Sequence, residues 1–176
     1  MLAFESERQF RALRSALVLG GHLDGREQGA FLFASPEEEG TLRVVEIAVI
    51  RTQDFTVQTA HCLQLQEDVL QNMILRAHGT STALVEAHSH PFTSGSRVCL
   101  SPTDREGLAQ AGPHVAWRLP ERPYIALVFG WDAFDSLYWE GRDRPPRGCV
   151  DLLVGGQLLR ASRESKRSWR ESHGQI

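Results

Sequence analysis

Apolar residues recur at helical spacing in two stretches of the chain. The first stretch covers residues 5–19 and the second covers residues 65–78. In each, the apolar positions share one face of a helix, namely Phe10, Leu13, Ala16 and Leu17 in the first and Val69, Leu70, Met73, Ile74 and Ala77 in the second. Gly20 and Gly21 are expected to end the first helix, and Gly79 the second.

Short runs of β-branched and aromatic residues predict the strands of a sheet. Two runs around a Gly- or Pro-containing turn are typical of an antiparallel hairpin. Three such pairs occur, namely 29–35 with 42–50, 123–130 with 134–140, and 150–162, which turns at Gly155 and Gly156. Another short strand is expected at residues 55–57. Residues 81–90 predict a buried strand that ends at Pro91, because proline cannot continue a central ladder.

A third helix is predicted to start near residue 101. Ser101 can cap it, Pro102 suits its first position, and Asp104 lies in its first turn. The chain therefore predicts a mixed α+β fold, in which a mixed sheet is flanked by two or three helices. We expect one domain over residues 1–162 and a flexible, polar and basic tail over residues 163–176.

Composition places the chain among ordinary globular proteins. It has 176 residues, of which 41% are hydrophobic and 23% charged, with a net charge of −3. That balance gives no support to nucleic-acid binding. The three cysteines form no CxxC pair, which favours a reducing compartment over a disulfide framework. The start of the chain lacks the pattern of a signal peptide, and no apolar run is long enough to span a bilayer. A cytoplasmic protein without a membrane partner is expected.

Residues 86–104 carry the candidate chemistry. His88 and His90 lie two positions apart at the end of a predicted strand, so that both imidazoles point to the same face. Asp104 begins the next helix and can add a carboxylate oxygen. Two histidines and one carboxylate are the ligands of many catalytic zinc sites, in which the fourth position is left to water. The sequence predicts one Zn²⁺ held by His88, His90 and Asp104.

This segment resembles the motif of the JAB/MPN metalloprotease family, also called JAMM. The motif is a Glu followed by HxHP and SxxD, here His88-Ser89-His90-Pro91 and Ser101-Pro102-Thr103-Asp104. The resemblance extends over about residues 5 to 140, in which the predicted elements follow the family's order. It implies a curved mixed sheet of the MPN/JAB type. The gap between His90 and Ser101 is about three residues longer than is usual in the family, which makes residues 92–100 an expanded loop beside the metal.

The resemblance also implies the catalytic residues. The position of Glu27 ahead of the first hairpin strand matches that of the family's general base, while Glu46 and Glu86 are competing carboxylates. Glu27 is expected to accept a proton from zinc-activated water and deliver it to the leaving amine. Ser101 is expected to donate a hydrogen bond to the oxyanion.

By resemblance, the function is that of an isopeptidase or peptidase that cleaves after the C-terminal tail of a ubiquitin-like protein. Bacterial proteins of this kind often accompany ubiquitin-like, E1-like and E2-like partners. The implied role is deubiquitinase-like deconjugation or precursor processing, with a ubiquitin-like protein or its conjugates as substrate.

Three other interpretations remain open. The same residues would serve a peptidase that trims a sulfur-carrier protein after its Gly-Gly end. Some family members have lost the metal and act as scaffolds, although all four motif side chains are present here. The family also has a branch that associates with nucleic acids. The slightly acidic chain gives this interpretation little support, although its tail is basic.

Overall fold

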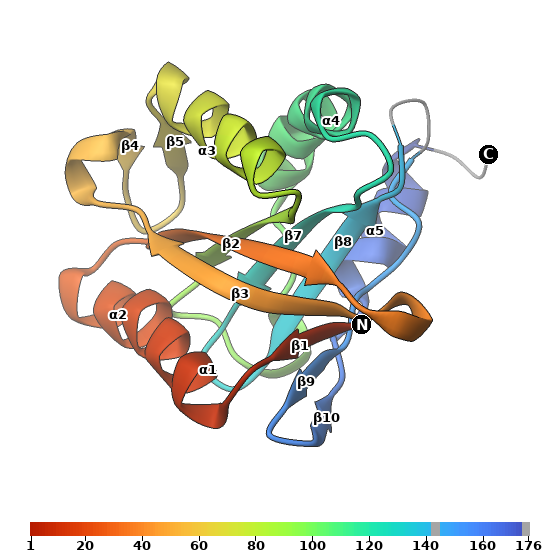
Figure 1. The fold of residues 1–176 in the computed structure, drawn as a ribbon. Coiled ribbons are helices and arrows are strands. Elements are labelled where there is room, and N and C mark those ends of the chain that lie inside the picture. Colours follow the sequence, from red (N-terminus) through yellow and green to blue (C-terminus); the bar gives the residue numbers. More distant parts are fainter. Residues whose placement is uncertain (142–144, 174–176) are drawn as a thin grey trace.

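One curled, mixed sheet forms the centre of the computed structural model, which describes residues 1–141 and 145–173 (Figure 1). Its strand order is β10-β9-β1-β3-β2-β6-β7-β8. The strands are β1 (Leu2–Phe4), β2 (Gly29–Pro36), β3 (Leu42–Val49), β6 (Ala83–Ser89), β7 (Tyr124–Phe129), β8 (Phe134–Trp139), β9 (Leu152–Val154) and β10 (Gln157–Leu159). A separate two-stranded sheet pairs β4 (Phe55–Gln58) with β5 (Leu63–Leu65). The expected α+β class is confirmed.

The three predicted hairpins are present. β2 and β3, β7 and β8, and β9 and β10 each pair antiparallel. The parallel pairs are β6 with β7, and β1 with both β3 and β9. β1 was not predicted, because a strand of three residues has too few positions to show alternation.

Helices cover both faces of the sheet (Figure 1). On one face lie α1 (Glu7–Arg14), a π-helical turn over Ser15–Leu19 and α2 (Gly20–Asp24). On the other face lie α3 (Glu67–Gly79) and α4 (Pro102–Arg118), which continues through Pro113. Each face has its own apolar core, the first built around Leu13, Leu17 and Leu32 and the second around Phe31, Ile74 and Leu84. No helix in the described part of the chain has the length and apolar character needed to cross a bilayer.

The first helical segment does not end at Gly20 and Gly21 as predicted. It continues to Asp24 and ends at Gly25, whose φ of 68° suits glycine. Gly21 instead permits close packing, since a Cβ there would lie 2.9 Å from the Arg26 carbonyl oxygen and 3.1 Å from Ser89 Oγ. The glycine therefore brings α2 against the end of β6.

The prediction of a flexible tail is wrong for most of that segment. Residues Glu164–His173 form α5, which packs beside β8 (Figure 1). Asp135 accepts hydrogen bonds from the main-chain nitrogens of Arg163 (3.0 Å) and Ser165 (2.7 Å) at its start. Trp169 is buried and meets Trp139 edge to face. One buried aromatic ring thus docks a segment that is otherwise polar. Residues 174–176 lie outside the described part.

Candidate metal centre

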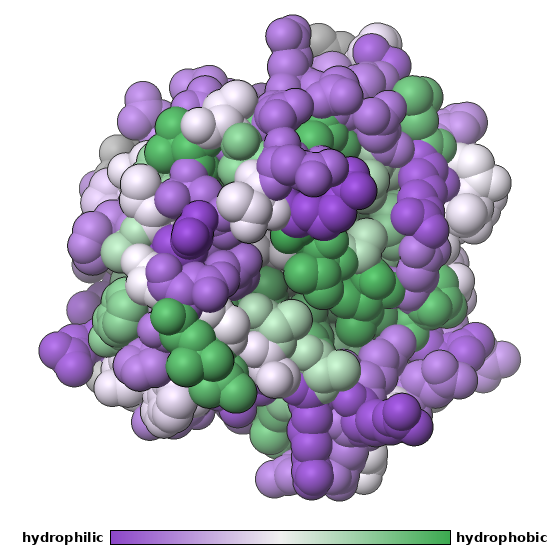
Figure 2. Space-filling model, turned by 90° about the vertical axis from the view of Figure 1, so that its left-hand side faces the viewer, coloured by the Kyte–Doolittle hydropathy of each residue, from purple (hydrophilic) through white to green (hydrophobic). Residues whose placement is uncertain are grey.

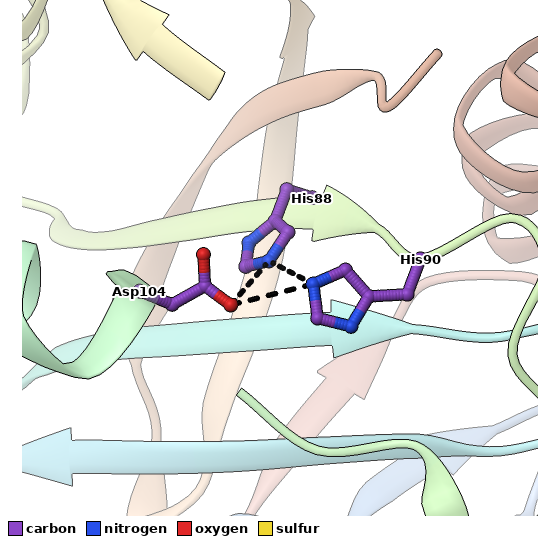
Figure 3. Close-up of side chains that lie close together, drawn as sticks. All are labelled: His88, His90 and Asp104. Carbon is purple, nitrogen blue, oxygen red and sulfur yellow. Dashed lines mark hydrogen bonds and ion pairs between the residues drawn. The ribbon is translucent and has the colours of Figure 1, made fainter. Parts of the chain in front are cut away.

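The two histidines are placed by the central strand β6. His88 is near the end of this strand, and His90 follows one residue after it. The main-chain nitrogen of His90 donates to the Phe129 carbonyl oxygen at 2.8 Å, which keeps His90 in line with the β6–β7 ladder. Since alternate residues of a strand share a face, both imidazoles point the same way. Figure 3 shows the two rings and the Asp104 carboxylate pointing toward one another.

Asp104 is placed by the capping box that starts α4. Ser101 Oγ accepts from the Asp104 main-chain nitrogen at 3.1 Å, and Asp104 Oδ2 accepts from the Ser101 main-chain nitrogen at 2.6 Å. The Oδ2 atom that is held in this way also faces the two imidazoles. The helix cap therefore fixes the orientation of the carboxylate in the site.

The spacing of the three candidate ligand atoms suits a four-coordinate metal. His88 Nε2 and His90 Nε2 are 3.3 Å apart, and Asp104 Oδ2 lies 3.4 Å from the first and 3.3 Å from the second. Metal–ligand bonds of about 2.0–2.1 Å in a tetrahedron place neighbouring ligand atoms about 3.3 Å apart. These residues are a group that could hold a metal ion, and their separations match one face of such a tetrahedron.

Electrostatics around the three side chains favour a bound cation. Burial alone would lower the pKa of His88, but the carboxylates of Asp104, Glu27 and Glu86 raise that pKa to about 9. Burial opposes ionisation of Asp104, yet His88 and the hydrogen bonds to its carboxylate leave its pKa well below the usual range. Three carboxylates thus act on His88, and a metal ion bound at the centre would take the place of its proton.

Glu27 is the acid nearest to the three ligands. It is 3% exposed, and its Oε1 lies 3.5 Å from His90 Nε2. The antiparallel register explains this position, because Gly29 pairs with His88 and the Ser89 nitrogen donates to the Gln28 carbonyl oxygen. Glu27 is therefore opposite His90. Burial raises its pKa, and His88 and His90 offset part of that rise.

The two competing acids have other partners. Glu46 is near the surface in an ion pair with Arg76. Glu86 lies on the same face of β6 as His88, but the Tyr124 hydroxyl donates to its Oε2. Burial raises the pKa of Glu86, and the Tyr124 hydrogen bond acts against that rise. Of the three carboxylates, Glu27 has the geometry that a base at the metal centre needs.

The main chain of Glu27 is held on both sides by the end of β4, a feature that the sequence did not reveal. Its nitrogen donates to the Thr59 carbonyl oxygen at 2.7 Å, and Gln58 Nε2 donates to its carbonyl oxygen at 3.0 Å. Gln58 Nε2 also donates to Gln28 Oε1 at 3.1 Å. These contacts join residues about thirty positions apart, so no local pattern could predict them.

Replacing Gln58 by leucine removes these donors, and any reaction in which Glu27 acts as a base is expected to slow about tenfold to a hundredfold, because a small displacement of a reacting group is costly. Metal content should not change, since Gln58 touches none of the three ligands. Gln53→Leu is the matched control, because Gln53 is exposed and only its carbonyl oxygen is used, by Gln66. Equal rates for the two variants, measured as kcat at saturating substrate, would show that Gln58 does not position Glu27.

The expanded loop, residues 92–100, is tied to the turn between β7 and β8. The Trp131 nitrogen donates to the Thr93 carbonyl oxygen at 2.8 Å, and the Gly95 nitrogen donates to Asp132 Oδ1 at 2.6 Å. Gly130 leaves no room for a side chain in this turn, since a Cβ would lie 2.5 Å from the Thr93 carbonyl oxygen. Cys99 is partly buried, and burial raises the pKa of its thiol. The loop is thus anchored beside the centre, and Cys99 is not part of the candidate metal group.

A cavity of about 330 Å³ opens beside His88 and Asp104. One wall is Cys62, β5 and the start of α3, and the other is the first part of α4, while Glu86 and Ala126 also line it. Neither Glu27 nor His90 is among its lining residues. On the face formed by β4, β5 and α2, hydrophobic side chains are interleaved with hydrophilic ones (Figure 2). The centre therefore has a cavity on the His88 side and the candidate base on the His90 side.

Comparisons with known proteins inform the fold alone. No family model matches the chain, and no curated protein matches its sequence. Among solved structures it is similar to the solution structure of protein DSY2949 from Desulfitobacterium hafniense, a structural genomics target. The two share 11% sequence identity with a TM-score of 0.50, over 90% of this chain and 95% of that chain. The architecture is thus shared nearly from end to end, while the site is described by its own geometry.

Proposed function

We propose that this chain is a zinc-dependent peptidase of the JAMM type with a curved MPN/JAB-like sheet. The observation that carries the proposal is the set of three ligand atoms at 3.3–3.4 Å from one another, with the buried Glu27 carboxylate 3.5 Å from one of them. Metal ligands and an adjacent carboxylate base are the two components of metal-assisted amide hydrolysis.

Zinc is the metal that suits this donor set best. Two imidazoles and one carboxylate are typical of catalytic zinc, whereas magnesium and calcium prefer oxygen ligands throughout. When bound by His88, His90 and Asp104, zinc would supply a Lewis acid and activate water at neutral pH. Three protein ligands leave one tetrahedral position for that chemistry.

Glu27 and Ser101 supply the proton transfer and the hydrogen bond that the reaction also needs. Glu27 accepts the proton released by the attacking water and delivers it to the leaving amine. Its burial and raised pKa suit a group that must both take and give a proton near neutral pH. The Ser101 hydroxyl, whose oxygen accepts from the Asp104 nitrogen, retains its own proton to donate to the developing oxyanion.

The proposed substrate is the C-terminal tail of a ubiquitin-like protein, cleaved from a conjugate or from a precursor. β5 pairs with β4 on one side, and β5 also lines the cavity beside the metal centre. The free edge of a strand can pair with an extended peptide. Along α4 the cavity is lined by the short side chains of Thr103 and Ala111 and by Gly107, which let a peptide backbone come close.

A cleavage assay tests this function directly. Two substrates carry the same ubiquitin-like tail, one joined to a lysine side chain and the other to a linear extension. Cleavage of the branched substrate supports deconjugation, while cleavage of the linear one alone supports precursor or sulfur-carrier processing. If the zinc-loaded protein cleaves neither substrate, the peptidase proposal is wrong and a scaffold role gains support.

Ser101→Ala is expected to lower turnover on the order of a hundredfold, as for other single oxyanion donors. The loss of its cap also costs stability of about 1 kcal/mol. Ser6→Ala separates the two effects, since Ser6 Oγ caps α1 by accepting from the Gln9 nitrogen at 3.2 Å. The melting temperature should fall by a similar amount in both variants, whereas turnover should fall in Ser101→Ala alone. A normal rate in Ser101→Ala would remove Ser101 from the mechanism.

A further inference from the structure

Apart from the candidate ligand His88, the charged side chains that line the cavity beside the metal centre are acidic. Its lining includes three carboxylates, those of Glu67, Glu86 and Asp104. Among the described residues that line it there is no lysine or arginine. Asp104 is committed to the candidate metal group, but Glu67 and Glu86 are not. The carboxylates of Glu67 and Glu86 therefore remain available to bind a ligand.

Glu86 is held in place within this cavity. Tyr124 is fully buried, and its hydroxyl donates to Glu86 Oε2. No other hydrogen-bond partner of this carboxylate occurs among the described residues. A guanidinium or ammonium group in the cavity would supply the missing donors and the opposite charge. A fixed acceptor of this kind selects ligands at a lower entropic cost than a mobile surface acid does.

The position of the base gives the direction in which a substrate lies. Glu27 must reach the leaving amine, and Glu27 is next to His90. The cavity is on the other side, beside His88 and Asp104. The leaving group is therefore placed toward Glu27, and the acyl part of the substrate lies in the cavity.

The spacing of Glu86 from the centre defines which residue it meets. Glu86 precedes His88 by two positions of β6, a separation of about 6.6–6.8 Å along a strand. An extended substrate advances by the same amount over two residues. The side chain that meets Glu86 belongs to the residue about two positions before the scissile one, which is the third residue counted back from the cleaved bond.

We infer that Glu86 selects substrates with arginine or lysine at the third residue before the cleaved bond. This inference rests on the proposed peptidase function and adds to it a determinant of specificity. Tyr124 is a positioning residue for Glu86, and Glu67 adds negative charge to the cavity wall.

The test uses fluorogenic peptides of the form acetyl-Leu-Xaa-Gly-Gly-aminocoumarin, in which Xaa is Arg, Gln or Glu, with zinc-loaded full-length protein. The expected kcat/KM for Arg exceeds that for Gln by about tenfold to a hundredfold, as for hydrogen bonds to charged groups. Glu is expected to be poorest. Glu86→Gln, which can still accept from Tyr124, should remove the preference for Arg.

A charge reversal adds a gain of function. Glu86→Lys should prefer the substrate with Glu, and if that variant fails to fold, Glu67→Lys at the exposed wall should weaken the preference for Arg. An unchanged preference for Arg in folded Glu86→Gln would overturn the inference, as would equal kcat/KM for the three wild-type substrates.

A binding readout separates this inference from the peptidase proposal. The product peptides acetyl-Leu-Xaa-Gly-Gly are titrated into the zinc-loaded protein by calorimetry. If no substrate is cleaved but the Arg peptide binds more tightly than the Gln and Glu peptides, and this difference disappears in Glu86→Gln, the cavity assignment holds and the peptidase proposal fails. Equal binding of all three peptides overturns the cavity assignment, whatever the activity.

Discussion

Replacing Glu27 by glutamine is expected to reduce turnover by about 10²–10⁴, the usual contribution of a positioned general base. Glutamine preserves the shape of the side chain but cannot carry a proton from water to the leaving amine. Zinc content should stay at one ion per chain, because Glu27 Oε1 lies 3.5 Å from His90 Nε2 and is outside the three-residue candidate metal group. Steady-state kinetics together with metal analysis of the same preparation measure both quantities.

The matched control is Glu46→Gln, which makes the same chemical change in a carboxylate that pairs with Arg76 near the surface. Its rate should equal that of the wild type. A near-normal rate in Glu27→Gln would require another base, and Glu86 would then be tested first because it shares the His88 face of β6.

The second large effect is expected from Asp104→Asn. Asparagine retains an oxygen that can accept from the Ser101 nitrogen, so that the α4 cap is kept, but its neutral amide is a poor zinc ligand. Loss of a group that merely supports a ligand weakens metal binding by about 10–100-fold. Loss of the ligand itself should therefore weaken zinc binding by at least about a hundredfold and abolish activity. Competition with a chromophoric chelator measures the affinity.

Asp68→Asn serves as its control, because Asp68 also lies in the first turn of a helix, α3, but is not part of the candidate metal group. Its zinc affinity should match that of the wild type. If Asp104→Asn held zinc as tightly as the wild type, Asp104 would have to be removed from the ligand set.

Most of the sheet and the grouping of the three candidate ligands follow from local sequence signals. The hairpins are set by runs of β-branched residues around turns. The meeting of His88, His90 and Asp104 needs only a strand end followed by a helix start. Resemblance to a family motif predicts Glu27, and the β2–β6 register supplies the physical reason for its place opposite His90.

The features that the sequence did not predict depend on tertiary contacts. α2 continues through two glycines because Gly21 packs against the Arg26 carbonyl and Ser89. α5 is ordered by Trp169 against Trp139 and by the Asp135 cap, although its surface is polar and basic. The hydrogen bond from Gln58 to the Glu27 carbonyl oxygen joins segments about thirty residues apart. Helix propensity and hydrophobic periodicity are local signals and do not reveal such long-range contacts.

Zinc content of the purified protein is the most direct test of the proposed zinc site. The protein is expressed without an affinity tag that binds metal, dialysed, and analysed by inductively coupled plasma mass spectrometry beside the His88→Ala variant. We expect one zinc per wild-type chain and none above background in the variant. A wild-type protein that neither contains zinc nor binds it stoichiometrically on titration would show that the proposed zinc site is wrong.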